Sequence, residues 1–310
     1  MGDPTNFSLL SVAGVPVFGG NPNPITGSVY FVDSSTGLNS NAGGSPSTAF
    51  ASLDWAIGKC TANKGDTIYV MPNHAETITG AGGITADIAG IDIIGLGKYN
   101  QRPRFLMDAA TTVTFVVSAA DVTVRNLVFA SGHADVVTCF NVTGKGCWID
   151  QCEFVENVAD ENFVTAIKAT GAANTGDGLK VTNCTFFQID ASTAEFIEIT
   201  DDIIQLYVVG NLFISEGTAC PLILQAGTKI CTGAFIAWNF TSIKNTANAL
   251  FISNGGTGNT GIIAHNRFGH ADTTTTHDWG AATGFRLFDN LSTSVDNLSG
   301  VILPAADVNS

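Results

Sequence analysis

The sequence predicts an all-β protein, a right-handed parallel β-helix (solenoid), and three observations support this prediction. An eight-residue phrase recurs, for example VTVRNLVF at 122–129, LKVTNCTF at 179–186 and LYVVGNLF at 206–213. Its copies start at 91, 122, 147, 179, 206, 233 and 261, and unequal steps of this size are typical of solenoid coils. Only 13% of the residues are charged, 34 are Gly, and no helical segment of about ten residues separates the phrases, which excludes βαβ units.

The phrase itself predicts a corner. Val122 and Val124 alternate with polar residues, as in a strand with one buried face. Phe129 follows Val124 at an odd interval, so the chain must bend between them for both to face inward. The residue three positions before the Phe is one that tolerates a left-handed backbone in most copies. We therefore expect a structural ladder at one corner, formed by Asn126, Gln151, Asn183 and Gly210.

A second apolar strand is expected between phrases, at 114–117, 138–142, 196–199, 222–225 and 249–252. In the looser phrases at 233–240 and 261–268 the ladder Asn has shifted to Asn239 and Asn266, and His265 stands in the ladder position. Cys152 and Cys184 occupy the same place in consecutive phrases. We expect them to stack as small buried hydrophobic side chains, because two ligands are too few for zinc.

The two ends of the sequence do not contain the repeated phrase. Residues 28–79 are expected to cap the β-helix of 28–290 with a short amphipathic helix from about Ser52 to Cys60. Residues 1–27 form an extended apolar arm that packs either on this chain or on a neighbouring one, and residues 291–310 form a tail. The residues of the arm expected to bind a partner are Phe7, Leu9, Leu10, Val15, Val17 and Phe18.

The capping segment resembles the N-terminal segment of pectate-lyase-like parallel β-helix proteins. The matching pieces are Val32-Asp33, Gly37 to Asn41, Ser52-Leu53 with Ala56-Ile57, Gly65 to Val70 and Pro72. Ser47-Thr48-Ala49 and Asn73-His74 depart from the pattern of that family. The whole chain also resembles the uncharacterised β-helix proteins of tailed-phage genomes. That resemblance implies a virion component, such as a capsid decoration protein or a spike.

Charge and cysteine content narrow the function classes. The net charge is −14 and the 13 basic residues are scattered, so we expect no binding to nucleic acid or to anionic membranes. No apolar run reaches the roughly 18 residues of a membrane span. Seven cysteines without a CxxC pair, and a start without a cationic signal-peptide region, predict synthesis in a reducing compartment. Together with the resemblance to phage proteins, this implies synthesis in the host cytoplasm and a final location in the virion.

The sequence offers only weak candidates for chemistry. The turns that precede the phrases carry a mixture of acidic and basic residues, with no arginine to partner the acids. The best acidic cluster is Glu198, Asp201 and Asp202, with Glu195 nearby, and a solvated turn is the favoured interpretation over a cation or substrate site. The five histidines show no metal-binding spacing. We therefore expect no catalytic residue, no metal and no cofactor.

Two function hypotheses follow from these observations. The first is a non-enzymatic structural component of a phage particle, a capsid decoration (cement) or spike-type protein. It would self-associate, with a trimer favoured, and bind a major capsid protein or another virion protein. The alternative is a polysaccharide-binding or polysaccharide-degrading tailspike or lyase, in which a glycan lies along the coils. A groove lined by Trp148, Trp238 or Tyr207 beside Glu198 and Asp202 would favour the alternative.

Overall fold

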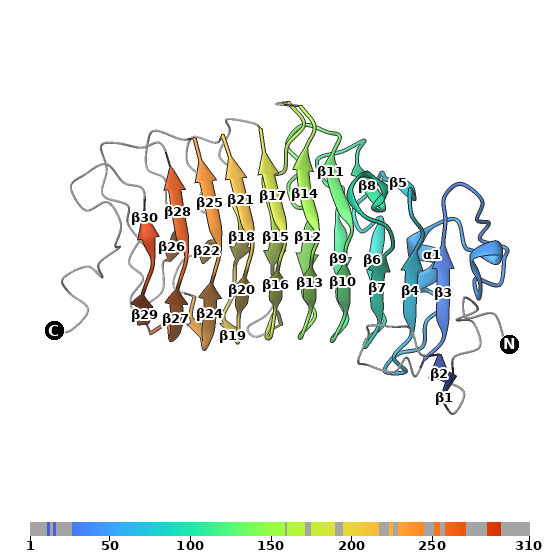
Figure 1. Cartoon of the computed structure of the whole chain (residues 1–310), viewed down its shortest axis with the longest axis horizontal. Coiled ribbons are helices and arrows are strands. Elements are labelled where there is room, and N and C mark those ends of the chain that lie inside the picture. The colour runs from blue at the N-terminus through green and yellow to red at the C-terminus, as the bar shows by residue number, and fades with distance from the viewer. Residues whose placement is uncertain are drawn as a thin grey trace, which may run out of the picture.

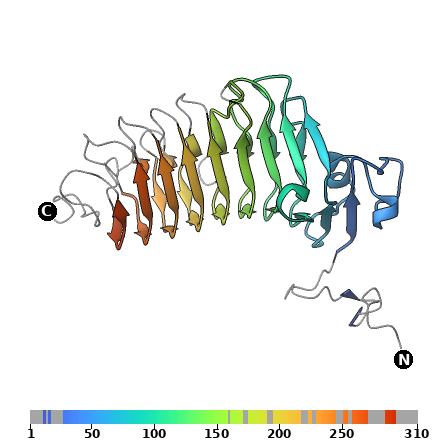
Figure 2. The same cartoon turned by 45° about the horizontal axis from the view of Figure 1, so that its top comes forward.

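The protein is a parallel β-solenoid in the computed structural model, as the sequence predicts (Figure 1). The structure describes residues 27–158, 160–170, 175–189, 195–216, 223–225, 229–244, 251–254, 258–270 and 284–292, together with the backbone of 11–12 and 15–16. Figures 1 and 2 show that the strands follow one another along a single axis from β3 to β30.

Three long parallel sheets run along this axis in the described part of the chain. The 10-stranded sheet contains β3 (Val29–Val32), β4 (Thr67–Val70), β7 (Asp92–Gly95), β10 (Thr123–Arg125), β13 (Trp148–Asp150), β16 (Lys180–Thr182), β20 (Tyr207–Val209), β24 (Ala234–Ala237), β27 (Gly261–Ala264) and β29 (Phe285–Phe288). The 9-stranded sheet contains β5 (Ala75–Ile78), β8 (Arg104–Met107), β11 (Val128–Ser131), β14 (Glu153–Glu156), β17 (Thr185–Gln188), β21 (Leu212–Ser215), β25 (Phe240–Ile243), β28 (Arg267–His270) and β30 (Leu291–Ser292). The 7-stranded sheet contains β6 (Ile84–Ala86), β9 (Phe115–Val117), β12 (Phe140–Val142), β15 (Thr165–Ala169), β18 (Glu195–Ile199), β22 (Ile223–Gln225) and β26 (Ile252–Asn254).

Smaller elements complete the described chain. Strand β19 (Ile203–Ile204) pairs in parallel with β23 (Cys231–Thr232), and β1 (Ser11–Val12) pairs antiparallel with β2 (Val15–Pro16). Two short 3-10 helices are η2 (Pro46–Thr48) and η3 (Tyr99–Gln101).

Each phrase forms two strands joined by a corner. In the copy at 122–129, β10 ends at Arg125 and β11 begins at Val128, so the bend lies between Val124 and Phe129. Val124 aligns with Ile149, which aligns with Val181, so successive copies are stacked on adjacent coils. Strand β15 (Thr165–Ala169) belongs to the second-strand series but was not predicted, because its sequence TAIKA alternates poorly.

The phenylalanine of the phrase forms the core of the solenoid. Phe105, Phe129, Phe154, Phe186 and Phe213 stack along the 9-stranded sheet, with ring centroids 4.8–5.6 Å apart. Each of these rings is at most 2% exposed. Because each of these five coils contributes one ring to the same file, the coils must keep one register for the rings to remain in contact.

The corner residues have the backbone that the sequence analysis assigned to them. The φ angles are 58° at Asn126, 55° at Gln151, 54° at Asn183 and 70° at Gly210. Each of these four residues donates its backbone N–H to a carbonyl oxygen of the following coil. The same corner continues at Trp238, His265 and Asp289, with φ angles of 54°, 58° and 51°.

The expectation that Asn239 and Asn266 are shifted members of this corner ladder is wrong. Trp238 and His265 occupy the corner, and the asparagines lie one residue later, at the position of Asn211 and Asn290. The copy at 233–240 was misaligned by one residue. Phe240 pairs with Leu212 and is 51% exposed, while Thr241 takes the inward position opposite Phe213.

These later asparagines form a second, buried ladder. Each of Asn211, Asn239, Asn266 and Asn290 is 1% exposed. The Asn239 side chain accepts the backbone N–H of Asn211 at 3.0 Å and donates to the Val208 carbonyl at 2.9 Å. It also donates to the Asn266 side chain at 3.0 Å. The amides therefore form a continuous hydrogen-bonded chain from coil to coil, which we call the asparagine ladder.

The N-terminal end of the solenoid is closed by a helix, as predicted. Helix α1 (Leu53–Ile57) buries Leu53, Ala56 and Ile57 and packs against β3, β4 and β6. It is shorter than the predicted range because it ends at Gly58. The predicted partner-binding residues Phe7, Leu9, Leu10, Val17 and Phe18 lie outside the described residues, as do positions 293–310 of the tail, and Val15 is described only as backbone in β2.

We expect that replacing Asn239 with Ala lowers the free energy of unfolding by about 3 kcal/mol, because it leaves the buried Asn211 N–H and Val208 carbonyl without partners. Urea unfolding followed by circular dichroism measures this change. Asn100→Ala, at an exposed position in η3, is the matched control and should change the stability by less than about 0.5 kcal/mol. Equal effects of the two substitutions would contradict the structural role of the ladder.

Candidate functional site

Two of the acids singled out from the sequence tie one coil to the next. Asp201 and Asp202 lie on the turn between β18 and β19. Asp201 accepts a hydrogen bond from the Lys229 Nζ at 2.8 Å, and this bond lowers the pKa of the Asp201 carboxyl. Asp202 accepts the backbone N–H of Ile230 at 2.8 Å. Both partners belong to the following coil, so these carboxylates connect adjacent coils at this turn.

Glu198 has a different partner. It lies on β18 opposite Lys168 of β15, and its Oε2 is 2.7 Å from the Lys168 Nζ. Thr165 donates its hydroxyl to the same oxygen at 3.4 Å. The three predicted acids thus pair with separate groups and do not converge on one point.

Glu195 is the acid with unusual chemistry. It lies on β18 with Glu198 and is partly buried. Burial, followed by repulsion from Glu198, raises the pKa of Glu195 to about 7, although Lys168 opposes the shift. The described hydrogen bonds include none to its carboxyl group. This side chain can therefore exchange a proton near neutral pH.

Glu195 borders a small cavity inside the solenoid wall. The cavity has room for about one water molecule. The described residues that line it are Phe154, Glu156, Phe163, Ala166, Phe187, Gln188, Glu195 and Phe196. Half of these residues are phenylalanines, and the polar groups are two carboxyl groups and one amide.

The sequence analysis missed Glu156 and Gln188. Glu156 is 3% exposed and accepts the backbone N–H groups of Phe163 at 3.2 Å and Ile189 at 2.8 Å. Gln188 is 1% exposed and accepts the Ser215 hydroxyl at 2.5 Å. Both residues lie two positions after the core phenylalanine of their phrase. Extending the strand alternation past that phenylalanine would have predicted an inward polar file.

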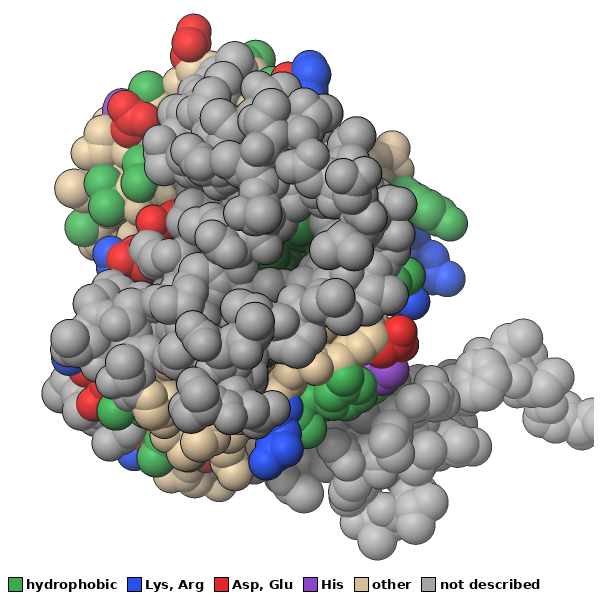
Figure 3. Space-filling model, turned by 90° about the vertical axis from the view of Figure 1, so that its left-hand side faces the viewer, with side chains coloured by type: hydrophobic (Ala, Val, Ile, Leu, Met, Phe, Trp, Pro, Cys, Tyr) green, Lys and Arg blue, Asp and Glu red, His purple; other side chains and the backbone are tan. Residues whose placement is uncertain are grey.

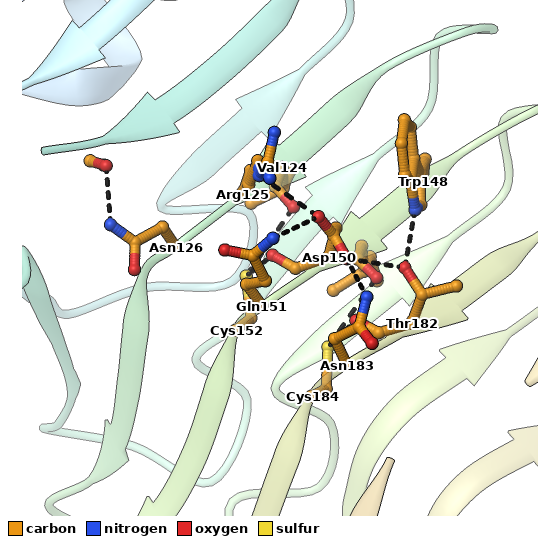
Figure 4. Close-up of polar contacts among 12 residues, drawn as sticks. Val124, Arg125, Asn126, Trp148, Asp150, Gln151, Cys152, Thr182, Asn183 and Cys184 are labelled. Carbon is orange, nitrogen blue, oxygen red and sulfur yellow. Dashed lines mark hydrogen bonds and ion pairs between the residues drawn. The ribbon is translucent and has the colours of Figure 1, made fainter. Parts of the chain in front are cut away.

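At the predicted corner ladder, the buried carboxylate of Asp150 has several hydrogen-bond and ion-pair partners (Figure 4). The Asp150 carboxylate is 2% exposed and pairs with Arg125 at 3.1 Å. It also accepts the Gln151 amide at 3.1 Å and the Asn183 amide at 2.9 Å. A buried carboxylate held by this many donors connects the residues of the corner.

Exposed aromatic side chains gather at another place. Trp148, Lys180, Tyr207 and Phe235 occupy one file of the 10-stranded sheet. Near its C-terminal end, rings from successive coils contact one another and form what we call the outer aromatic patch, which consists of Tyr207, Phe235, Trp238, His265 and Phe288.

Within this patch the Trp238 and His265 rings are stacked at 5.4 Å. Trp238 is 55% exposed and Phe288 is 49% exposed. Figure 3, which views the end that carries β29 and β30, shows hydrophobic side chains beside a histidine at the surface. The predicted groove would require these aromatic side chains to lie on the same sheet as Glu198. They do not, because Glu198 lies on the 7-stranded sheet.

The cysteines and the histidines do not form a further site in the described part of the chain. Cys152 and Cys184 are each 1% exposed, and burial raises the pKa of the Cys152 thiol to about 12. His74 is buried and bonds the backbone N–H of Ser34 and the Glu76 carboxylate. Among the described residues, no group of three or more His, Cys, Asp or Glu is placed to hold a metal ion. No described helix has the length and hydropathy of a membrane span.

The similarities of this chain to known proteins are weak and are to solved structures. No protein-family model matches the sequence, and no curated protein matches it. Among solved structures, it is similar to a rhamnogalacturonan lyase, with 12% identity, a TM-score of 0.45, and coverage of 89% of this chain and 90% of the other. It is also similar to the GH136 lacto-N-biosidase from Eubacterium ramulus, with 10% identity, a TM-score of 0.29, and coverage of 86% and 67%. At these identities and scores, the activities of the two neighbours are not transferred to this chain.

The raised pKa of Glu195 predicts a pH dependence of stability. Its pKa is about 7 in the folded chain against 4.5 ordinarily, so the folded state binds more protons between these values. The stability contribution is therefore complete below about pH 4.5 and is lost as the pH rises toward 7. We expect Glu195→Gln to remove this part of the decline and to raise the melting temperature at pH 8 relative to the wild type.

Thermal unfolding at pH 5 and pH 8 measures the effect. Glu216→Gln is the control, because Glu216 is an exposed acid paired with Lys244. Parallel pH profiles for the wild type and Glu195→Gln would contradict the assignment of the raised pKa.

Proposed function

We propose that this protein is a non-enzymatic structural component of a phage particle, either a capsid decoration (cement) protein or a spike. In this proposal it is made in the host cytoplasm and resides in the virion. The observation that carries the proposal is the outer aromatic patch, because contiguous exposed rings of this kind mark a surface that contacts another molecule.

The arrangement of the acids supports a structural role. Asp150, Asp201 and Glu198 each pair with a basic residue of an adjacent coil. Ion pairs of this kind connect adjacent coils and make the solenoid rigid. Hydrolysis or elimination at a sugar needs carboxyl groups that are poised on one reacting centre. Glu195 is the described acid with a pKa near neutrality, and the acid beside it, Glu198, is paired with Lys168.

We propose further that the patch joins copies of this chain, with a trimer favoured, and that other surfaces bind a major capsid protein or another virion protein. Burying Trp238 and Phe288 against another chain would supply the hydrophobic free energy of association. The net charge of −14 opposes association through repulsion between copies. Association should therefore strengthen as salt screens that repulsion.

Sedimentation velocity of the full chain at low and moderate salt tests this proposal. We expect a species with the mass of three chains, favoured by salt, and we expect Trp238→Ser to weaken its formation at least about tenfold, as for a central interface tryptophan. Trp55→Ser is the matched control, because Trp55 is 44% exposed but lies on α1. Mass spectrometry of purified particles should detect the chain. A monomer at all concentrations, together with its absence from particles, would refute the proposal.

The alternative of a polysaccharide-binding or polysaccharide-degrading protein is favoured by one specific observation. Trp148 and Tyr207 are exposed on the same file with Lys180 between them, and the Lys180 Nζ is 5.9 Å from the centre of the Trp148 ring. Flat rings beside a cation could hold an acidic glycan along the coils.

Affinity electrophoresis through gels that contain acidic polysaccharides, with and without calcium, tests the alternative. If it holds, Trp148→Ala should lose the retardation that the wild type shows, whereas Trp55→Ala should keep it. Product formation can be followed in parallel by the absorbance of unsaturated sugars and by reducing ends. The absence of both retardation and product would remove the alternative.

A further inference from the structure

The outer face of the 9-stranded sheet carries apolar side chains on three adjacent coils. Leu212 of β21 pairs in register with Phe240 of β25, and Ile214 of β21 pairs with Phe187 of β17. Leu212 and Ile214 are two residues apart, so their side chains share the face opposite to the buried Phe213. Phe240 is 51% exposed and Phe187 is 37% exposed. We call Phe187, Leu212, Ile214 and Phe240 the second apolar surface.

The charged groups that border the second apolar surface favour contact with another copy of this acidic chain. Glu216 directly follows β21 and pairs with Lys244 at 3.1 Å. On the preceding coil, Glu153 pairs with Arg102. The residue that follows Phe240 along the same file is the exposed Arg267. The repulsion that the net charge of −14 causes between copies is therefore weaker here, and the surface has the apolar centre and polar border of an interface.

The second apolar surface and the outer aromatic patch flank one corner of the same coils. Tyr207 of β20 and Leu212 of β21 belong to one coil, and Phe235 of β24 and Phe240 of β25 belong to the next. Trp238 lies at the corner between β24 and β25. Figure 1 shows that β20 and β21, like β24 and β25, occupy the same position along the axis of the solenoid. Exposed apolar side chains therefore lie on both sides of this corner at the same level.

The symmetry of a trimer requires two such surfaces. A rotation by one third of a turn cannot bring a surface onto itself, so each contact in a ring of three joins two different surfaces. A rotation about an axis parallel to the solenoid also produces no shift along that axis. The surface that contacts the outer aromatic patch must then lie on the same coils as the patch, and the second apolar surface meets this condition.

We propose that the outer aromatic patch of one copy packs against the second apolar surface of the next copy, with the Trp238 corner directed toward the threefold axis. This inference rests on the proposed self-association and adds the surface that receives the patch. Tyr207 and Phe235 of one copy contact Phe187 and Phe240 of the next. The outer face of the 7-stranded sheet stays outside the contact between copies.

A mixing experiment with two variants of the full chain tests this proposal. Tyr207→Asp places a charge in the outer aromatic patch, and Phe240→Asp places one in the second apolar surface. In sedimentation velocity at moderate salt, we expect each variant alone to form trimers at least about tenfold more weakly than the wild type. An equimolar mixture, at concentrations well above those at which the wild type forms trimers, should contain a species with the mass of two chains. That species forms because the intact patch of Phe240→Asp packs on the intact second surface of Tyr207→Asp.

Val137→Asp is the matched control, because Val137 is 50% exposed and lies outside both surfaces. It adds the same charge and should form trimers as the wild type does, and circular dichroism should show the same fold for all three variants. A wild type that forms trimers while Phe240→Asp associates as strongly as Val137→Asp would overturn this inference and leave the proposed trimer intact. The absence of a two-chain species from the mixture would also overturn it. A wild type that stays monomeric would contradict the proposed self-association and this inference together.

Discussion

The structure depends on one constraint: every coil must stack on the next in the same register at its corner. The asparagine ladder imposes this constraint on the C-terminal coils. Asn211, Asn239, Asn266 and Asn290 each accept a backbone N–H of the preceding coil, and each donates to a backbone carbonyl in that part of the fold. A slip of one residue would leave these buried amides unpaired, at a cost of about 1–3 kcal/mol for each unsatisfied group. The phenylalanine file occupies the coils before this ladder and shares with it the coil that carries Asn211 and Phe213.

In the N-terminal coils, the same corner is stabilised by different side chains. At the position of the buried asparagines they carry Leu127, Cys152 and Cys184, which cannot form an amide ladder. The polar group at this corner is Asp150, the residue before the corner residue Gln151. Its carboxylate pairs with Arg125 and accepts hydrogen bonds from the Gln151 and Asn183 amides, and these three partners lie on three successive coils. The asparagine ladder begins at Asn211, whose side chain accepts the backbone N–H of Cys184 at 2.9 Å. The cysteines are therefore structural substitutes for asparagine rather than a reactive pair.

The sequence predicted the solenoid and its capping helix because both depend on short-range patterns. The phrase at 122–129 carries its own bend, and the odd interval from Val124 to Phe129 requires that bend. The misalignment at Trp238 arose because the pattern there contains both a phenylalanine and an asparagine near the corner, and either could be taken as the marker. The acidic candidates near Glu198 were identifiable, but their pairing with Lys168 and Lys229 depends on which coils are adjacent. Gln188 and its cavity were missed because the alternation was not extended past the core ring.

The net charge of the chain bears on the proposed association between copies. The chain has 27 acidic and 13 basic residues, and Lys145, Lys168, Lys229, Lys244, Arg102 and Arg125 are used in ion pairs with acids. The excess acids make most of the rod repel other copies of itself. At the outer aromatic patch, Trp238 and Phe288 are exposed, and the His265 ring contacts Asp289 at 2.6 Å. In the proposed assembly, the outer aromatic patch would therefore have to supply attraction that outweighs this repulsion.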